Sequence, residues 1–258
     1  MDTFHAHHAD IHAPGWQPRV TALLREHGLV TFTGITGPAA LAGVARALMS
    51  IRPHRDAGPD GVTLITDTGT ADPGYAAFTD AELIPHTDGT SLPDPPGPPG
   101  LLLLTCQQPA SHGGTTLLAD AARITATLAG QHPAALRALS APRAAYFGAA
   151  GGYLGPVCEP AGPGRARIRL RLDDLAMFSA DATPLIPVLR AAITQHQQTI
   201  QLRAGQGLLV SNTRWLHGRT RYTGPRVMLR ILGDPLPGTG IQPGFPAPAL
   251  GTHTAQAA

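Results

Sequence analysis

Residues 82–97 read ELIPHTDGTSLPDPPG and set His86 two positions before Asp88, at the end of a short run that suits a β-strand. Side chains at positions i and i+2 of a strand point to the same side, so an imidazole and a carboxylate would lie together there. The prolines and glycines that follow cannot continue the strand. The stretch therefore predicts a strand that ends in two side chains able to close on one small object, for which a metal ion is the first candidate.

The composition of the chain is that of a globular protein with a proper core. Of its 258 residues, 43% are hydrophobic and 14% are charged, and the formal net charge is +2. These values exclude a disordered chain and a basic nucleic-acid footprint, so nucleic acid is not an expected partner. All 19 basic residues are arginine, and the lack of lysine excludes Schiff-base chemistry and a P-loop.

The cysteines and the apolar runs bear on the location of the protein. Cys106 and Cys158 are too few for a disulfide framework and lack the paired spacing of a zinc site. The opening residues, MDTFHAHHADIHAPGW, have no apolar stretch of the kind that a secretory signal needs. The longest aliphatic run, LLLL at 101–104, is too short to span a bilayer. A cytoplasmic protein with no membrane partner is expected.

Hydrophobic periodicity predicts many short strands with helices mostly outside the β-rich middle. The expected helices cover 18–27, 37–50, 120–129, 133–140 and 183–197. The expected strands cover 29–35, 61–67, 82–88, 100–106, 113–120, 165–172, 199–205, 207–212 and 225–234. This order predicts a mainly β protein with flanking helices, whose core is a jelly roll, or double-stranded β-helix. No GxGxxG follows a strand, so no dinucleotide-binding domain is expected.

The chain divides into three parts on composition. Residues 1–17 form a polar, His-rich segment, 18–234 a single jelly-roll domain, and 235–258 a tail rich in Pro, Gly and Ala that should pack weakly. The segment 151–164, rich in Gly and Pro, is expected to be an exposed excursion. The alternating arginines of RARIRLRL, residues 165–172, are expected to face solvent.

A histidine two positions before an aspartate is weak evidence by itself. A second copy, His8-Ala9-Asp10, lies in the polar first segment and is interpreted as solvated. The pair His86 and Asp88 differs because NTRWLHGRT, residues 212–220, places His217 after another strand-like run. Two histidines and one carboxylate form a facial triad that leaves the opposite face of octahedral iron(II) open.

The strand-like run PRVMLRI adds an anion-binding prediction. On a strand, Arg226, Met228 and Arg230 would share one face. If that face lies inside a β-sandwich, two guanidinium groups point inward, and burying them without an anion would cost several kcal/mol. Thr116, in HGGTTLLAD, is a strand hydroxyl that could add a hydrogen bond to the same anion.

The ordered set PHTDGT, GGTTLLAD, GQGLLVSNTRWLHGRT and PRVMLRILGD resembles the taurine dioxygenase/TfdA-like family of Fe(II)- and 2-oxoglutarate-dependent oxygenases, from about Gly28 to Asp234. The resemblance implies that O2 is the co-reactant and that the metal ligands are His86, Asp88 and His217. It also implies that Arg226, assisted by Thr116, binds 2-oxoglutarate, and that Arg230 binds an anionic group of the substrate. The interval from His217 to Arg226 is short for the family, so the roles of the two arginines stay open, with Arg226 favoured for 2-oxoglutarate.

The implied function is hydroxylation, or another oxidation at an unactivated C–H bond, of a small anionic metabolite or natural-product intermediate such as an amino acid derivative. Thr90 and Ser91 are candidate substrate contacts, and residues 71–81 could form a further wall through Tyr75 or Phe78. The carboxylate at position 88 argues against halogenation, since chlorinating relatives have Gly or Ala there.

Two other functions fit parts of the pattern. The same three ligands suit a zinc-dependent hydrolase, although that reading gives no reason for inward arginines. A non-catalytic jelly-roll binding protein would keep the fold without turnover, and the intact ligand set argues against it. The sequence has no feature that sets an oligomeric state.

Overall fold

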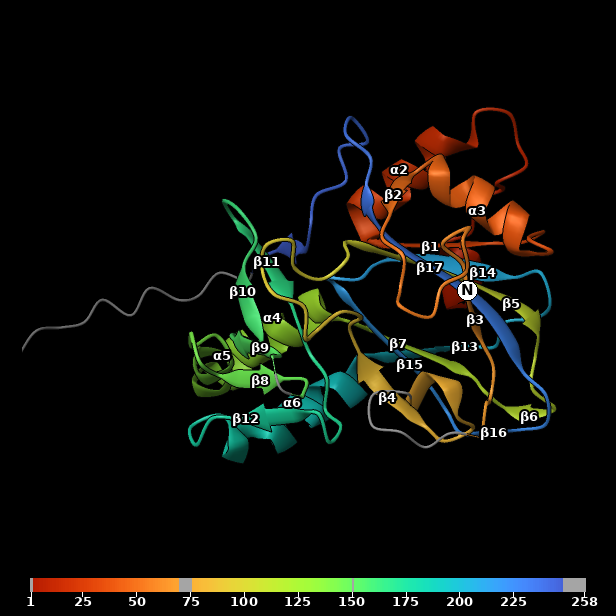
Figure 1. Ribbon diagram of the computed structural model, residues 1–258. Helices are drawn as coiled ribbons and strands as arrows, with labels where there is room; N and C mark the ends of the chain where they lie inside the picture. The colour runs from red at the N-terminus through yellow and green to blue at the C-terminus, as the bar shows by residue number, and fades with distance from the viewer. Residues whose placement is uncertain (1, 70–75, 150, 248–258) are drawn as a thin grey trace, which may run out of the picture.

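The computed structural model describes residues 2–69, 76–149 and 151–247, and two antiparallel sheets form its centre (Figure 1). The larger sheet runs, in spatial order, through β1 (Leu29–Phe32), β14 (Gly207–Ser211), β5 (Leu101–Gln108), β17 (Val227–Pro235) and β2 (Met49–Ile51), and β3 (Thr63–Ile65) also pairs with β17. The smaller sheet runs through β13 (Gln197–Ile200), β7 (Thr116–Asp120), β15 (Trp215–Arg219) and β4 (Leu83–His86).

Alternation along β5 shows how the larger sheet is buried on both faces. Leu101 and Leu103 belong to a core beneath two helices, whereas Leu102 and Cys106 belong to the core between the sheets. The smaller sheet contributes Leu118 to the same inter-sheet core. An uninterrupted apolar run is the pattern of a strand covered on both sides, and the strand predicted over 100–106 is confirmed by β5.

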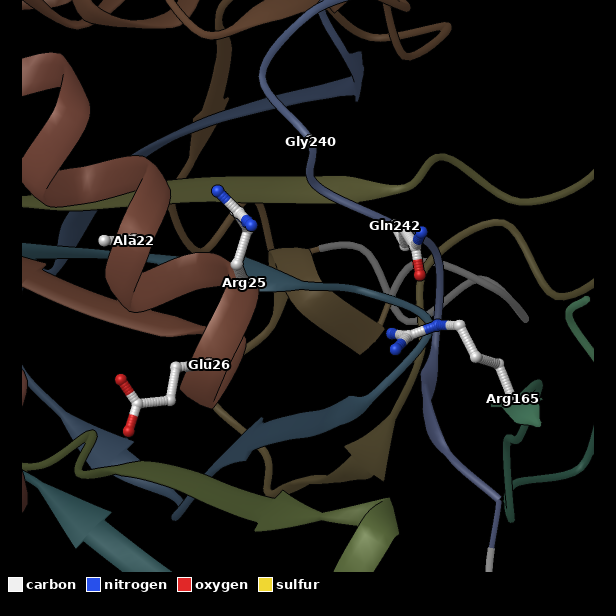
Figure 2. A pocket seen from close by; sticks show the side chains of 6 residues that line it. All are labelled: Ala22, Arg25, Glu26, Arg165, Gly240 and Gln242. Carbon is white, nitrogen blue, oxygen red and sulfur yellow. The ribbon is translucent and has the colours of Figure 1, made fainter. Parts of the chain in front are cut away.

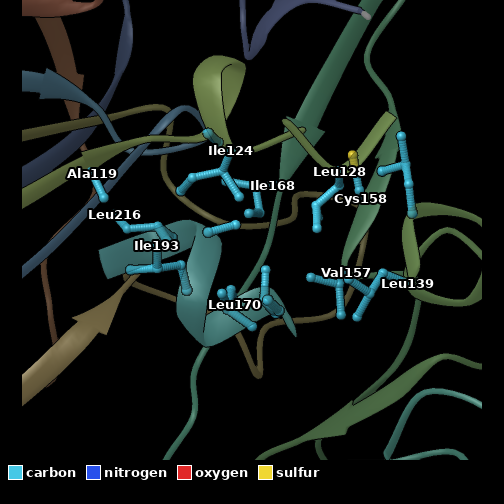
Figure 3. Close-up of a cluster of buried hydrophobic side chains, with 14 of the residues drawn as sticks. Ala119, Ile124, Leu128, Leu139, Val157, Cys158, Ile168, Leu170, Ile193 and Leu216 are labelled. Carbon is cyan, nitrogen blue, oxygen red and sulfur yellow. The ribbon is translucent and has the colours of Figure 1, made fainter. Parts of the chain in front are cut away.

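Helices cover the outer face of each sheet. In Figure 1, α2 (Trp16–His27) and α3 (Pro38–Arg46) lie over the larger sheet, where Val20 and Leu41 are buried. The helices α4 (Ala121–Gln131), α5 (Pro133–Leu139) and α6 (Ile186–Gln195) pack on the smaller sheet. Figure 3 shows Ile124 of α4 and Ile193 of α6 in this second helical core. No helix among the described residues is both long and apolar enough to cross a membrane.

Short elements complete the chain around these layers. The two three-stranded sheets are β10 (Cys158–Pro160), β11 (Arg165–Ile168) and β18 (Phe245–Pro246), and β12 (Ala176–Phe178), β8 (Ala145–Phe147) and β9 (Tyr153–Gly155). The remaining pieces are β6 (His112–Gly113), β16 (Tyr222–Thr223), the helix α1 (Thr3–Ala6) and the 3-10 turns η1 (Ala76–Phe78) and η2 (Thr183–Leu185).

Several sequence expectations need correction, each because tertiary pairing or burial overrides local composition. The helix expected over 37–50 ends at Arg46, and Met49–Ile51 instead pairs with residues 233–235 of β17. The segment 151–164 is not simply exposed, because it contains β9 and β10 and buries Cys158. Arg169, expected to face solvent, is fully buried.

Both outer segments place apolar side chains in the cores. Phe4, Ala9 and Ile11 of the first segment are buried, and the amide of Ala9 donates to the carbonyl of Thr31 at 2.9 Å. The expectation of weak packing is also wrong for the start of the tail, because Phe245 is fully buried and β18 pairs with β11. Ile241 also packs against the core beneath α2 and α3, so the start of the tail is held at more than one point. Residues 248–258 lie outside the described part of the chain.

Candidate active site

The two histidines of the predicted triad face each other across adjacent strands. In the antiparallel pairing of β15 with β4, His217 lies opposite His86, and their ring centroids are 4.6 Å apart. Opposed residues of two paired strands project from the same face. Gly218 permits the close approach of these strands, since a Cβ added there would lie 2.3 Å from the carbonyl oxygen of Leu83. The imidazole pair is therefore fixed by backbone pairing.

Asp88 completes the triad two residues beyond the end of β4. Its Oδ1 lies 3.8 Å from Nε2 of His86, and its Oδ2 lies 3.7 Å from Nε2 of His217. All three residues offer a ligand atom within 4.8 Å of the others. The structure thus brings together the three residues that the sequence pattern selected.

The protonation states of the triad suit a metal ion. Nδ1 of His86 lies 3.0 Å from the carbonyl oxygen of Ile84 and donates to it, so Nε2 is the ring nitrogen that faces Asp88. Burial lowers the pKa of His217 and keeps this imidazole neutral. Burial alone would raise the pKa of Asp88, but the Arg230 guanidinium and the two imidazoles outweigh it and hold that pKa well below its ordinary value. Neutral imidazoles and an ionised carboxylate are the forms that bind iron(II).

A cavity of about 50 Å³ between the two sheets joins the histidines to the other predicted residues. Thr116, Arg226 and Arg230 line it together with His86 and His217. The rest of the lining is mostly apolar: Ile65, Ala77, Leu83, Leu102, Leu104, Leu208, Gly218, Arg219 and Met228. The prediction that Arg226, Met228 and Arg230 share one face agrees with this lining, and Leu229 enters the opposite core.

The two predicted arginines have different surroundings. Arg230 is 6% exposed, and its Nη1 donates to both oxygens of Asp88, at 3.3 and 3.2 Å, while its Nε has no hydrogen-bond partner among the described residues. Arg226 is 7% exposed, lies 5.4 Å from the centroid of the Tyr222 ring, and has no ion pair with any described carboxylate. Burial lowers the pKa of Arg226. A buried guanidinium that has no acid partner is available to bind an anion.

Arg219 is a cavity residue that the sequence reasoning missed. It is buried, and its guanidinium donates to the carbonyls of Ala76, Thr79 and Ala81. Its position in the sequence could have identified it, because Arg219 lies two residues after His217 on the same strand, and this spacing puts both side chains on one face. Arg219 therefore fixes the segment 76–81, which brings Ala77 to the cavity wall.

The candidate substrate contacts do not line this cavity. Thr90 is buried and its carbonyl oxygen accepts a hydrogen bond from Arg169, while Ser91 lies against Gly148. Their role in substrate binding stays a prediction. Phe78 packs in the inter-sheet core and is not a wall of the cavity, and Tyr75 lies outside the described residues.

A larger surface hollow lies away from the triad. Its volume is about 440 Å³, and it lies between α2 and the segment through Gly240 and Gln242 (Figure 2). Arg25, Glu26 and Arg165 line it, and Arg165 is already bonded to the carbonyls of Pro243 and Gly244. It shares no residue with the triad cavity, so size alone does not mark the site of chemistry.

Comparison with known proteins defines the class. The family model described as taurine catabolism dioxygenase TauD, TfdA family, matches residues 4–232, and the chain belongs to this family. The predicted fold class and the enzyme class, a non-heme iron oxygenase that uses 2-oxoglutarate and O2, are therefore confirmed. A comparison with curated proteins gave no match.

Solved structures with the same fold are distant in sequence. Asparagine oxygenase in complex with Fe(II), 2S,3S-3-hydroxyasparagine and succinate has a TM-score of 0.63 at 16% identity, over 86% of this chain and 80% of that chain. The non-heme iron oxygenase OrfP in complex with Fe and alpha-ketoglutaric acid has a TM-score of 0.61 at 15% identity, over 88% and 86%. The PvcB protein from Pseudomonas aeruginosa has a TM-score of 0.63 at 18% identity, over 84% and 79%.

Proposed function

We propose that this protein uses iron held by His86, Asp88 and His217 to oxidise an unactivated C–H bond of a small anionic metabolite, such as an amino acid derivative or natural-product intermediate. The observation that carries the proposal is the pairing of a two-histidine, one-carboxylate cluster with a buried, acid-free guanidinium at Arg226 in one cavity. A zinc hydrolase would need the cluster alone, and a binding protein would need neither.

Each polar group of the cavity then has a part. Iron held by the triad would activate O2, which is the oxidant, and 2-oxoglutarate would supply two electrons as it is converted to succinate and carbon dioxide. Arg226, assisted by Thr116, holds the distal carboxylate of 2-oxoglutarate, since both line the cavity with the histidines. Arg230 stabilises Asp88 through Nη1 and offers its unpartnered Nε edge to the substrate anion. The apolar lining keeps bulk water from these groups.

The charge of the cavity wall and the ligands of structural relatives support an anionic substrate. Arg219, Arg226 and Arg230 bring three buried cations to the cavity wall, and Asp88 is the acid that pairs with one of them. Anionic ligands balance the remainder. The solved relatives include enzymes in complex with hydroxyasparagine and with (3S)-hydroxy-L-Arg, which supports an amino acid derivative.

Turnover with defined co-products tests the proposal. Purified protein loaded with Fe(II) is incubated with 2-oxoglutarate, O2 and a panel of amino acids, their acylated or dipeptide derivatives, and uncharged analogues. Succinate should rise with a product 16 mass units heavier than one anionic member of the panel, as expected for insertion of one oxygen atom. The His217→Ala variant should form no succinate. Hydrolysis supported by Zn(II), with 2-oxoglutarate unconsumed, would contradict the proposal.

We further propose a cytoplasmic location and a single catalytic domain over residues 18–234. One observation supports the location: Cys106 and Cys158 are both unpaired and buried, as suits a reducing compartment. The proposed domain contains both central sheets except the last residue of β17. Small molecules are the expected partners, since the net charge of +2 favours no nucleic acid.

A further inference from the structure

Asn212 is the single asparagine of the chain, and its side chain is fully buried where β14 ends and the turn to β15 begins. Its Oδ1 accepts a hydrogen bond from the amide of Asp88 at 2.8 Å. Its Nδ2 donates to the carbonyl oxygen of Asp88 at 3.0 Å and to that of Pro99 at 2.8 Å. Both amide hydrogens and the amide oxygen of this side chain are therefore used.

The contact with Asp88 replaces strand pairing where the strand has ended. The strand β4 ends at His86, so the backbone of Asp88 has left the ladder. Asp88 is 9% exposed, and a buried amide or carbonyl without a partner is destabilising. The Asn212 amide offers one acceptor and one donor to the same residue, as a neighbouring strand would. It thereby holds the backbone from which the candidate iron carboxylate projects.

The contact with Pro99 closes the base of the proline-rich loop, residues 89–98. Asp88 and Pro99 flank this loop, and the two hydrogens of one Nδ2 bind both ends. The ends are tightly packed, because a Cβ added at Gly89 would lie 2.7 Å from Cδ of Pro99. The amide of Asn212 also donates to the carbonyl of Gly100 at 2.9 Å. The loop therefore leaves and rejoins the sheet at a point that Asn212 defines.

An independent contact fixes the residue before Asp88. The amide of Thr87 donates to the carbonyl of Leu170 at 2.9 Å, and Oγ1 of Thr87 accepts from the amide of Leu170 at 3.1 Å. Asp88 thus lies between a residue held by the segment around Leu170 and a loop that begins at Gly89. Asn212 is the group that sets the backbone of Asp88 itself.

We propose that Asn212 is a positioning residue for the metal site, which orients the Asp88 carboxylate by pairing with its backbone and by closing the base of loop 89–98. The inference rests on the proposed function in naming iron as the bound metal. The pairing itself is independent of that function. The turn that begins at Asn212 leads into β15, which carries His217.

The Asn212→Ala variant removes all three side-chain hydrogen bonds. Loss of a group that orients a metal ligand costs about tenfold to hundredfold in metal affinity, so the dissociation constant for Fe(II) should rise by that factor. The Asn212→Asp variant keeps an acceptor for the amide of Asp88 but turns a second oxygen toward the carbonyls of Asp88 and Pro99. It should weaken Fe(II) binding at least as much.

The neighbouring Thr213 supplies a matched control. Thr213 is buried, and its Oγ1 accepts a hydrogen bond from the amide of Gly244 at 2.8 Å, away from Asp88. The Thr213→Ala variant should lower the melting temperature, as the Asn212 variants do, and leave Fe(II) affinity unchanged within twofold. The comparison separates loss of a buried hydrogen bond from loss of ligand orientation.

The test uses two measurements on the full-length chain. Anaerobic calorimetric titration with Fe(II) gives the dissociation constants of wild type, Asn212→Ala, Asn212→Asp and Thr213→Ala, with circular dichroism confirming that each is folded. Amide hydrogen exchange of the metal-free proteins follows residues 87–90, where loss of protection is expected in the Asn212 variants alone.

The two measurements separate the two ideas. If wild type binds Fe(II) and the Asn212 variants bind it equally well, or if the amide of Asp88 stays as protected as in wild type, the positioning role is overturned. If wild type binds no Fe(II), the proposed function fails, and hydrogen exchange at Asp88 still decides whether Asn212 holds it. If Asn212→Ala does not fold, Asn212→Asp decides by the same two readouts.

Discussion

Replacing Arg226 with alanine should raise the KM for 2-oxoglutarate by about two orders of magnitude, with a far smaller effect on the KM for the organic substrate. A hydrogen bond to a charged group contributes about 1.5–3 kcal/mol. Arg226 is 7% exposed and has no ion pair with a described carboxylate, so a two-pronged contact should contribute about 3 kcal/mol, or roughly 150-fold in affinity. The Arg226→Lys variant keeps the charge but loses the two-pronged donor geometry of the guanidinium, so it should raise the KM for 2-oxoglutarate roughly tenfold.

Arg230→Ala is the matched comparison. In the wild-type protein, the Arg230 guanidinium donates to Asp88 at 3.2 and 3.3 Å. Its loss should weaken iron retention and raise the KM for the substrate, and the KM for 2-oxoglutarate should change little. The assay is initial-rate succinate formation at saturating Fe(II), with 2-oxoglutarate and substrate varied in turn. If Arg230→Ala raises the KM for 2-oxoglutarate more than Arg226→Ala does, the two roles are exchanged and the assignment is refuted.

Three further predictions concern the structure around the site. Arg169 is fully buried and donates to the loop after Asp88, so Arg169→Ala should lower the free energy of unfolding in urea by about 3 kcal/mol; a loss no larger than that of exposed Arg137→Ala would contradict this. Burial raises the pKa of Cys158 to about 11, so at pH 8 its thiolate is scarce, and a thiol reagent should label it only after unfolding; fast labelling of the native protein would show that the thiol is accessible. Phe245→Ala should cost about 3–5 kcal/mol in the same unfolding assay, and a near-neutral result would mean that the tail does not anchor on the core.

The candidate metal ligands could be selected from the sequence, although the reason was only partly right. The spacing of two selected His86 and Asp88, but β4 ends at His86 and Asp88 reaches the site from beyond the strand. The alternation of Arg226, Met228 and Arg230 places them on one face whichever strands flank them. The resemblance of ordered motifs supplied the pairing of distant segments. The sequence did not show that His217 lies opposite His86, because register is a property of two strands and not of either alone.

Other parts of the structure could not be predicted from local pattern. An alternating run such as RARIRLRL looks the same whether its polar face meets water or acidic side chains. Here Arg167 donates to Glu159 at 2.8 Å and also pairs with Asp94. The function of Asn212 was hidden for a similar reason, since its partners are brought to it only by the folded chain.

The pairing of His86 with His217 across β4 and β15 has a consequence for how the site can form. Backbone pairing of the two strands sets the spacing of the two imidazoles, so this spacing does not depend on side-chain rotation alone. If β4 slid by one position, its histidine would turn toward the helical layer, and the proposed iron site would lose a ligand. A complete loss of metal binding, beyond the graded losses expected of the single variants, would therefore indicate that this edge of the smaller sheet has not assembled in its native alignment.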